Sequence, residues 1–277
     1  MDRRSVLETP HESADRDIEH FVNSPTLQID NLRLHCLSSR LEMAGHAVQR
    51  IANRLRQALD SQENARVILA SAPSQDEMLA ALTNAELDWA RVTIFHMDEY
   101  LGLSSVHPAS FGHYQRMHVL NRITPGEFHP IDGETSEPAK ECERYTGLLV
   151  ERPIDLVCLG IGENGHLAFN DPPTADFSDP AWVKVVELDP ACRQQQVNDG
   201  CFAALEDVPR QAITLTIPAL MSARAVVAVV PGPRKAAAVR AALEGEISPA
   251  CPASILRRHG NADLYLDAAA ASLLVQP

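Results

Sequence analysis

The 277-residue chain has no apolar run of roughly 18 or more residues, so its sequence predicts no transmembrane helix. It also lacks the apolar core of a signal peptide, because the stretch from Met1 to Asp30 is polar and mixed in charge. None of its cysteines forms a C-x-x-C pair, so we expect reduced, mostly buried thiols, a cytoplasmic protein and no zinc site. The six cysteines are Cys36, Cys142, Cys158, Cys192, Cys201 and Cys251.

Positive charge is scarce as well, with 24 Lys and Arg residues against 37 Asp and Glu residues and a net charge of −13. A chain this acidic has no electrostatic surface for nucleic acid or for an anionic membrane. It also repels an anionic metabolite on average, so a phosphate site must be built locally. The hydrophobic fraction of 45% and the charged fraction of 22% are those of a folded globular protein.

The sequence contains no internal repeat and no low-complexity linker. Residues 1 to about 30 are expected to form an irregular N-terminal extension, because Pro10, Pro25 and many charges precede the first periodic segment. No shift in composition marks a boundary further on. We therefore expect residues 31–277 to form a single α/β domain.

Periodic apolar residues indicate helices that alternate with short strands. Residues 41–59 carry apolar side chains at three- and four-residue steps, and further helices are expected after Ser74 to about Leu82 and over 234–243. The apolar runs at 65–70, 92–96, 154–159 and 225–230, and a shorter one at 262–266, predict strands. This alternation predicts an α/β fold with a mostly parallel sheet covered on both faces, a three-layer αβα arrangement of modified Rossmann type.

Ligands of open parallel sheets bind beyond the carboxyl ends of the strands, so the segments after the predicted strands are the places to search. The first is Ser71-Ala72-Pro73-Ser74-Gln75-Asp76-Glu77, at the start of a predicted helix. Amides at a helix start bind anions. Alternatively, Ser74 and Glu77 form an S-x-x-E capping box that needs no ligand.

The second segment, Phe95 to Leu103, places two adjacent carboxylates, Asp98 and Glu99, at the end of a strand. Successive strand side chains point in opposite directions, so only one carboxylate is expected to face a shared pocket. A carboxylate in a dry pocket has a raised pKa and serves as a general base. The alternative is a solvated turn with a salt-bridged acid.

The third segment follows the strand at 154–159 and contains three glycines that permit a tight loop, Gly160, Gly162 and Gly165. His166 follows them, with Asn164 and Asp171 near enough in sequence to hold its ring, which is a common proton-transfer arrangement. The glycine spacing is that of a dinucleotide fingerprint, but the following Asn-Asp-Pro-Pro does not continue as a helix. We therefore reject a nucleotide-binding fold.

The fourth group of candidates is basic. Arg193 lies in Cys192-Arg193-Gln194-Gln195, and Lys235 follows the strand at 225–230. Arginine grips phosphate through two parallel hydrogen bonds and lysine acts as a point charge. In isolation, a residue of either type is more often a solvated surface cation.

Taken together, these segments resemble the glucosamine-6-phosphate deaminase family, which shares its fold with 6-phosphogluconolactonases. The chain matches F-x-M-D-E-Y-x-G-L over Phe95 to Leu103 and G-x-G-x-[DN]-G-H-x-x-F-N-[ED]-P over Gly160 to Pro172. Lactonases typically have D-E-R where this chain has Asp98-Glu99-Tyr100, so they are the weaker match. Shorter matches are His107–Phe111, Arg193, Lys235, Cys251–Ser254 and Asp267–Ala270.

The resemblance implies a role for each candidate residue in the conversion of glucosamine 6-phosphate and water to fructose 6-phosphate and ammonia. Asp98 would be the base that moves a proton from C2 to C1, and His166 would transfer a proton at the ring oxygen. Asn164 and Asp171 would orient His166. The residues implied to bind the phosphosugar and its phosphate are Ser71, Ala72, Ser74, Gly162, Arg193 and Lys235. No step demands a metal or an organic cofactor.

Three alternatives stay open at this point. The chain could be a 6-phosphogluconolactonase, an isomerase for another sugar phosphate such as galactosamine 6-phosphate, or a non-catalytic phosphosugar sensor. Such sensors usually carry a helix-turn-helix module, and residues 1–40 are too short and too polar to supply one. The resembled family includes monomers and hexamers, so the sequence leaves open whether copies of this chain associate.

Overall fold

The computed structural model describes residues 26–172 and 174–275. Its centre is an eight-stranded sheet in which only β1 and β2 pair antiparallel, while every other neighbouring pair is parallel. This confirms the predicted mostly parallel sheet. In their order across the sheet, the strands are β1 (Leu27–Ile29), β2 (Leu32–Leu37), β11 (Ala262–Asp267), β10 (Val226–Val230), β7 (Leu156–Leu159), β3 (Ala65–Leu69), β4 (Val92–His96) and β6 (Glu127–His129).

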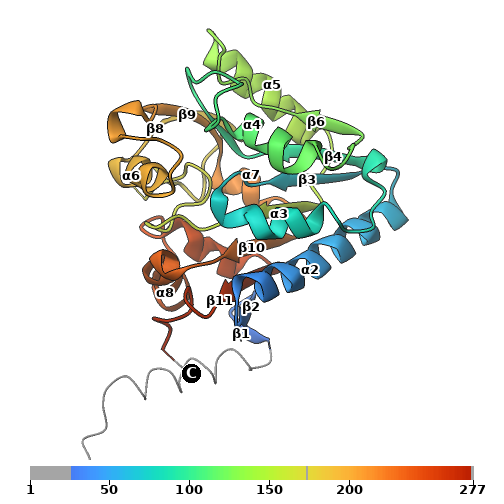
Figure 1. The fold of residues 1–277 in the computed structure, drawn as a ribbon, viewed down its shortest axis with the longest axis vertical. Helices are drawn as coiled ribbons and strands as arrows, with labels where there is room; N and C mark the ends of the chain where they lie inside the picture. Colours follow the sequence, from blue (N-terminus) through green and yellow to red (C-terminus); the bar gives the residue numbers. More distant parts are fainter. Residues whose placement is uncertain (1–25, 173, 276–277) are drawn as a thin grey trace, which may run out of the picture.

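Helices cover both faces of the sheet, because the central strands are apolar on both sides. In β7, Leu156 and Cys158 pack toward α2 and α3, whereas Val157 and Leu159 pack toward α5, α7 and α8. Figure 1 shows α2 and α3 beside each other along the sheet. The result is the predicted three-layer αβα arrangement. The helices are α2 (Arg40–Ser61), α3 (Asp76–Leu82), α4 (Phe111–Gln115), α5 (Pro138–Val150), α6 (Pro190–Asn198), α7 (Ile217–Met221) and α8 (Ala236–Glu244).

A second, smaller sheet was not expected from the sequence. It is antiparallel, and its three strands are β5 (Asp98–Tyr100), β9 (Gln211–Leu215) and β8 (Val183–Glu187), in that order. The helix α6 lies between β8 and β9 in the chain and beside them in Figure 1, at the upper left. A separate apolar cluster, which includes Tyr100, Phe169 and Phe202, holds this part of the molecule together.

The N-terminal extension is shorter than the sequence indicates. The prediction of irregular structure is wrong for Leu27–Ile29, which form β1 and pair with Leu32–Leu34 across a tight turn. The turn contains Asp30, whose φ of 50° lies in the left-handed region that Asp tolerates better than most residues. The rest of the extension, residues 1–25, lies outside the described residues.

Four of the six cysteines are buried, which agrees with the prediction of mostly buried thiols. In the described part of the chain, no helix is both long and apolar enough to cross a membrane. The sheet order β10-β7-β3-β4 makes neighbours of the four strands that precede the candidate segments. Because these strands are parallel, their carboxyl ends meet at one edge, and the fold brings the four segments together there.

Candidate active site

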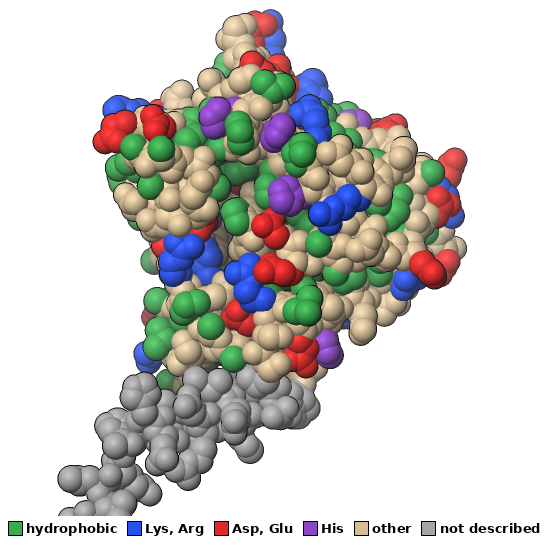
Figure 2. All heavy atoms as spheres, viewed as in Figure 1, with side chains coloured by type: hydrophobic (Ala, Val, Ile, Leu, Met, Phe, Trp, Pro, Cys, Tyr) green, Lys and Arg blue, Asp and Glu red, His purple; other side chains and the backbone are tan. Residues whose placement is uncertain are grey.

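A cavity lies at this edge, between the strand ends and the small sheet with its helix α6. Figure 2 shows the surface hollowed between the lobe that contains α6 and the body of the molecule. Most of the residues expected at a site line this cavity. Its lining consists of Ala70, Ser71, Ala72, Ser74, Gln75, Met97, Asp98, Phe111, Gly160, Ile161, Gly162, His166, Ala168, Phe169, Gln195, Gln196 and Lys235.

Asp98 is the carboxylate that faces the cavity. It is the first residue of β5, and β5 pairs with β9 so that Asp98 lies opposite Thr214. Its side chain is buried, and burial together with the nearby charge of Glu99 raises the pKa of Asp98 well above its usual value. A buried carboxylate of this kind binds a proton more strongly than a solvated one, as a general base must.

Glu99 points the other way, as strand alternation predicts. Its carboxylate accepts hydrogen bonds from the Ser110 hydroxyl (2.8 Å) and from the backbone amides of Phe111 (3.1 Å), Gly112 (2.8 Å) and Tyr100 (3.0 Å). Three of these donors belong to the start of α4. Glu99 therefore fastens α4 to β5, and its oxygens are already engaged within the protein.

His166 is held by two neighbours from its own loop. Its Nδ1 lies 2.8 Å from Asn164 Oδ1 and 3.1 Å from Asp171 Oδ1, and the Asn164 amide also donates to Asp171 Oδ1 at 2.9 Å. Burial acts to raise the pKa of Asp171, but the hydrogen bonds from His166 and Asn164 outweigh it and hold that pKa below its usual value. An ionised Asp171 orients the imidazole ring, as in a histidine that transfers protons.

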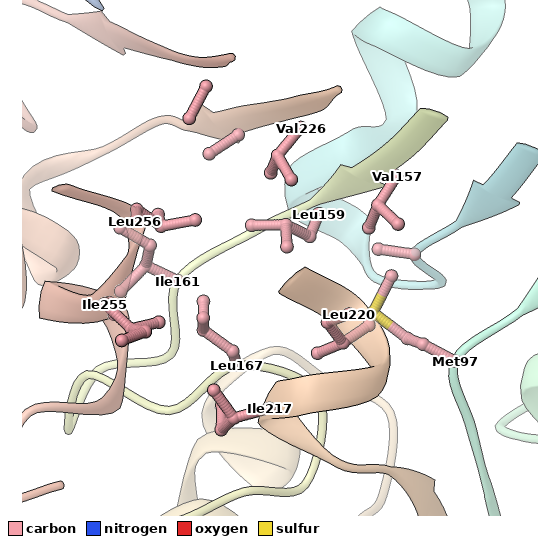
Figure 3. Packing of buried hydrophobic residues seen from close by; sticks show 14 of the residues in the cluster. Met97, Val157, Leu159, Ile161, Leu167, Ile217, Leu220, Val226, Ile255 and Leu256 are labelled. Carbon is pink, nitrogen blue, oxygen red and sulfur yellow. The ribbon is translucent and has the colours of Figure 1, made fainter. Parts of the chain in front are cut away.

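The backbone around His166 depends on its glycines and on two apolar anchors. Gly165 has a φ of +87°, and a Cβ at that position would lie 2.8 Å from the Cys251 sulfur. Ile161 and Leu167 flank residues 162–166 and are buried. Figure 3 shows Leu167 beside Ile217 of α7, and Ile161 on the side of Ile255 and Leu256. The loop is thus fixed in the core at both ends of the polar segment.

The serine segment turns into the cavity, where Ser71, Ala72 and Ser74 line the wall. The capping-box alternative is wrong, since Pro73–Gln75 form a short 3-10 helix and α3 begins after Gln75 without a side-chain cap. Lys235 reaches the same cavity from the segment after β10. It is buried, and burial lowers its pKa. A buried cation beside hydroxyl groups is a favourable environment for an anion.

Arg193 is the one predicted phosphate ligand that the structure does not bring into the cavity. Its guanidinium donates to the backbone carbonyls of Leu205 (2.5 Å) and Val208 (2.8 Å). The reason is its place on α6, because Cys192, Gln195 and Gln196 occupy the buried face at three- and four-residue spacing. Arg193 lies about a quarter turn away from them and ties α6 to the following loop.

Glutamines are the cavity residues that the sequence did not single out. Gln195 accepts a hydrogen bond from the backbone amide of Glu163 at 2.8 Å, and Gln196 lines the cavity beside it. Gln75 is fully buried behind Ser74. Amide side chains do not titrate, so they do not stand out as candidate catalytic residues. The run of three glutamines at 194–196 nevertheless indicated that one helix could contribute polar side chains to a cavity.

Among the described residues, the ligand atoms of His166, Asp171 and Cys192 lie within 4.8 Å of one another, which is close enough to hold a metal ion. Metals bind cysteine as the thiolate. Burial raises the pKa of the Cys192 thiol well above its usual value, which keeps the proton on the sulfur. The hydrogen bonds of His166 and Asp171 to each other and to Asn164 favour proton transfer as the use of this cluster.

The fold and the cavity define an α/β protein with an acid–base site at the carboxyl edge of a parallel sheet. The family described as glucosamine-6-phosphate isomerases/6-phosphogluconolactonase matches residues 38–265, and the chain belongs to this family. Among curated proteins, the glucosamine-6-phosphate deaminases of Bacillus cereus (strain G9842) and Bacillus thuringiensis (strain Al Hakam) are each 36% identical over 219 residues. That stretch covers 79% of this chain and 82% of each relative.

Solved structures agree with this assignment. A structure described as a monomeric glucosamine-6-phosphate deaminase is 29% identical and superposes with a TM-score of 0.80, over 87% of this chain and 99% of the other. The 6-phosphogluconolactonase from Shewanella baltica OS155 superposes with a TM-score of 0.72 over 89% of this chain and 99% of the other. At 20% identity, that second likeness shows the fold alone.

Proposed function

We propose that this chain deaminates and isomerises an aminosugar phosphate, converting glucosamine 6-phosphate and water to fructose 6-phosphate and ammonia. The observation that carries the proposal is Asp98, a buried carboxylate of raised pKa in the same cavity as His166 and Lys235. The names of the curated relatives support it, and so does their 36% identity over most of their length. The site residues that follow are assigned as part of this proposal.

His166 acts first, by moving a proton at the ring oxygen so that the cyclic sugar opens to its aldehyde. Asn164 and Asp171 hold Nδ1, which leaves Nε2 free to face the substrate. The ionised Asp171 keeps the ring in this orientation during the proton transfer. This use of a paired histidine needs no metal and no organic cofactor.

Asp98 then removes the proton from C2, which is acidic because the C1 carbonyl is adjacent. The same carboxyl returns the proton to C1, so the double bond moves to C2 and becomes an imine. Water adds at C2 and ammonia leaves, which gives the ketose. A positioned carboxylate typically contributes about 10²–10⁴-fold to such a proton transfer.

The phosphate is held by Lys235, by the hydroxyls of Ser71 and Ser74 and by the backbone at Ala72. These groups lie on two neighbouring loops of the sheet edge, and the buried Lys235 supplies the local positive charge that the acidic chain otherwise lacks. Gly162 lines the cavity in which the sugar would bind, and its lack of a side chain leaves room for the His166 ring. Arg193 is not assigned a phosphate contact, since its guanidinium is engaged with backbone carbonyls.

The test is ammonia release from glucosamine 6-phosphate, coupled to detection of fructose 6-phosphate. We expect the wild type to release ammonia, Asp98→Asn to lose about 10³-fold or more in kcat, and Asp60→Asn to be unaffected. Asp60 is an exposed acid on α2 and is distant in sequence from Asp98 and His166. The Asp60→Asn variant therefore controls for the change of charge.

A folded wild type that releases no ammonia from glucosamine 6-phosphate contradicts the proposal. Activity on galactosamine 6-phosphate would then indicate another aminosugar, and hydrolysis of 6-phosphogluconolactone would indicate the lactonase alternative. Binding of a phosphosugar without turnover of any of the three would indicate a sensor.

A further inference from the structure

Two buried glutamines donate hydrogen bonds to the two serines that line the cavity. Gln75 Nε2 donates to the Ser74 hydroxyl at 3.2 Å and to the Val229 carbonyl at 3.0 Å. A carbonyl oxygen only accepts, so Val229 fixes which end of the amide faces Ser74. The Gln75 side chain is fully buried, and its Oε1 atom has no hydrogen-bond partner among the described residues.

Gln115, from α4, repeats this arrangement at the other serine. Its Nε2 donates to the Ser71 hydroxyl at 2.8 Å and to the Ala70 carbonyl at 3.2 Å, which again fixes the orientation of the amide. Gln115 is also fully buried, and its Oε1 atom has no partner in the described structure either. Both glutamines are therefore used through their N–H groups alone.

A serine hydroxyl has one proton and two lone pairs, so a hydroxyl that accepts from an amide turns its own proton elsewhere. Ser74 makes no hydrogen bond as a donor within the described residues, and the Ser71 proton has only a long contact of 3.4 Å to the Phe111 carbonyl. Both hydroxyls border the cavity. Their protons are thus free for an anionic group placed there.

Two positions of this loop offer no free backbone N–H group. Pro73 has no N–H group, and the backbone amide of Gln75 already donates to the Ala72 carbonyl at 2.8 Å. The side-chain hydroxyls of Ser71 and Ser74 therefore add donors to the backbone amides that remain, such as that of Ala72.

We propose that Gln75 and Gln115 are positioning residues that orient the hydroxyl protons of Ser74 and Ser71 toward the phosphate of the substrate. Neither glutamine needs to touch the phosphate, since each acts through its serine. This inference rests on the proposed function, because it takes the ligand to be a phosphate ester.

The experiment measures the dissociation constant of inorganic phosphate by calorimetry on the full chain. Gln75→Met and Gln115→Met keep the length of the side chain and remove the donor. We expect each to weaken phosphate binding about tenfold and to raise KM for the phosphosugar more than it lowers kcat. Gln57→Met, at an exposed glutamine of α2, is the matched control and should change neither quantity.

Double variants separate this role from general damage. Gln75→Met should add little to Ser74→Ala, and Gln115→Met should add little to Ser71→Ala, whereas the crossed pairs should multiply their effects. Unchanged phosphate affinity in folded glutamine variants, or equal coupling in matched and crossed pairs, overturns the inference. If a glutamine variant does not fold, Ser74→Ala and Ser71→Ala decide: no loss of phosphate affinity in either also overturns it. A wild type that binds no phosphate contradicts the proposed function instead.

Discussion

Gly162 and His166 are packed so closely that a Cβ on the glycine would lie 2.2 Å from Cε1 of the imidazole ring. Two other ring atoms would lie 2.3 Å away, so no small adjustment of the ring relieves the clash. The backbone of the two residues is joined as well, because the Gly162 amide donates to the His166 carbonyl at 2.9 Å. The His166 ring can therefore occupy its position only because residue 162 has no side chain.

Gly162→Ala is expected to displace His166 from Asn164 and Asp171 and to lower kcat at least about 100-fold, as steady-state kinetics will show. Gly45→Ala is the control, since Gly45 lies in α2 with nothing within 4 Å of an added Cβ. That control should retain activity and gain about 0.5–1 kcal/mol of stability, because alanine favours a helix. Full activity in Gly162→Ala would show that the ring position does not matter.

Asp98→Asn is expected to raise the free energy of unfolding at pH 7 by about 1 kcal/mol while activity is lost. The reason is the raised pKa of Asp98: a buried ionised carboxyl destabilises the fold, and an amide does not. Because the pKa of Asp98 is raised in the folded state, the destabilisation by its carboxylate decreases as the pH falls below that pKa. Urea unfolding at pH 7 and pH 5 should show the difference between the two proteins shrinking at the lower pH. A less stable variant at pH 7 contradicts this.

Glu99→Gln is expected to do the opposite and lower stability by about 2 kcal/mol. Burial raises the pKa of Glu99 as well, but an amide N–H would face the donors of Ser110 and Gly112, and this clash outweighs the removal of the buried charge. Thermal or chemical denaturation measures the loss. Activity should fall far less than in Asp98→Asn, because Glu99 lies outside the cavity. Glu206→Gln, at an exposed acid, controls for the removal of a charge.

Asp263 is the centre of an ion cluster that joins β2, β11 and α2. It accepts from Arg33 (2.6 Å), Arg50 (2.8 Å) and His35 (3.0 Å). Burial would raise the pKa of Asp263, but these hydrogen bonds outweigh it and hold the pKa far below its usual value. Removing the carboxylate would leave several cations facing one another.

Asp263→Asn is therefore expected to destabilise the protein by about 2–3 kcal/mol at pH 7. A depressed pKa stabilises the fold above the ordinary carboxyl value, and this contribution is lost as pH falls below about 4. Denaturation curves at pH 7 and pH 3 should show the gap between wild type and variant closing. An equal gap at both values would mean that ionisation of Asp263 is not the source of its effect.

The strands of the central sheet could be predicted because they are buried on both faces, and such strands are continuous apolar runs in the sequence. The predicted strands at 92–96 and 225–230 agree with β4 and β10 to within one residue, and the stripe at 41–59 lies inside α2. The small sheet escaped prediction because β8, Val-Lys-Val-Val-Glu, is partly exposed and has no clear alternation. Pairing between β5 and β9 depends on residues more than a hundred positions apart, which local pattern does not report.

The site could be predicted where a residue type carries its own chemistry. Asp98, His166 and Lys235 were singled out because they are titratable groups that follow predicted strands, and the family resemblance implied their roles. The structure brings all three to one cavity. Arg193 shows the limit of that reasoning, since the direction of a side chain on α6 depends on the packing of the helix. Gln75 and Gln115 could not be predicted for a related reason, since their proposed role depends only on the serine hydroxyl that each contacts.

The small antiparallel sheet divides the cavity between two structural units. Asp98 begins β5, and α6 with its glutamines lies between β8 and β9, whereas His166, Lys235 and the serine loop belong to the large sheet. Only Met97 separates β4 from β5 in the chain. In evolutionary terms, the unit that we propose binds phosphate and opens the ring can stay fixed while the smaller one is remodelled. New sugar specificities can therefore arise on this fold without rebuilding the proposed anion site.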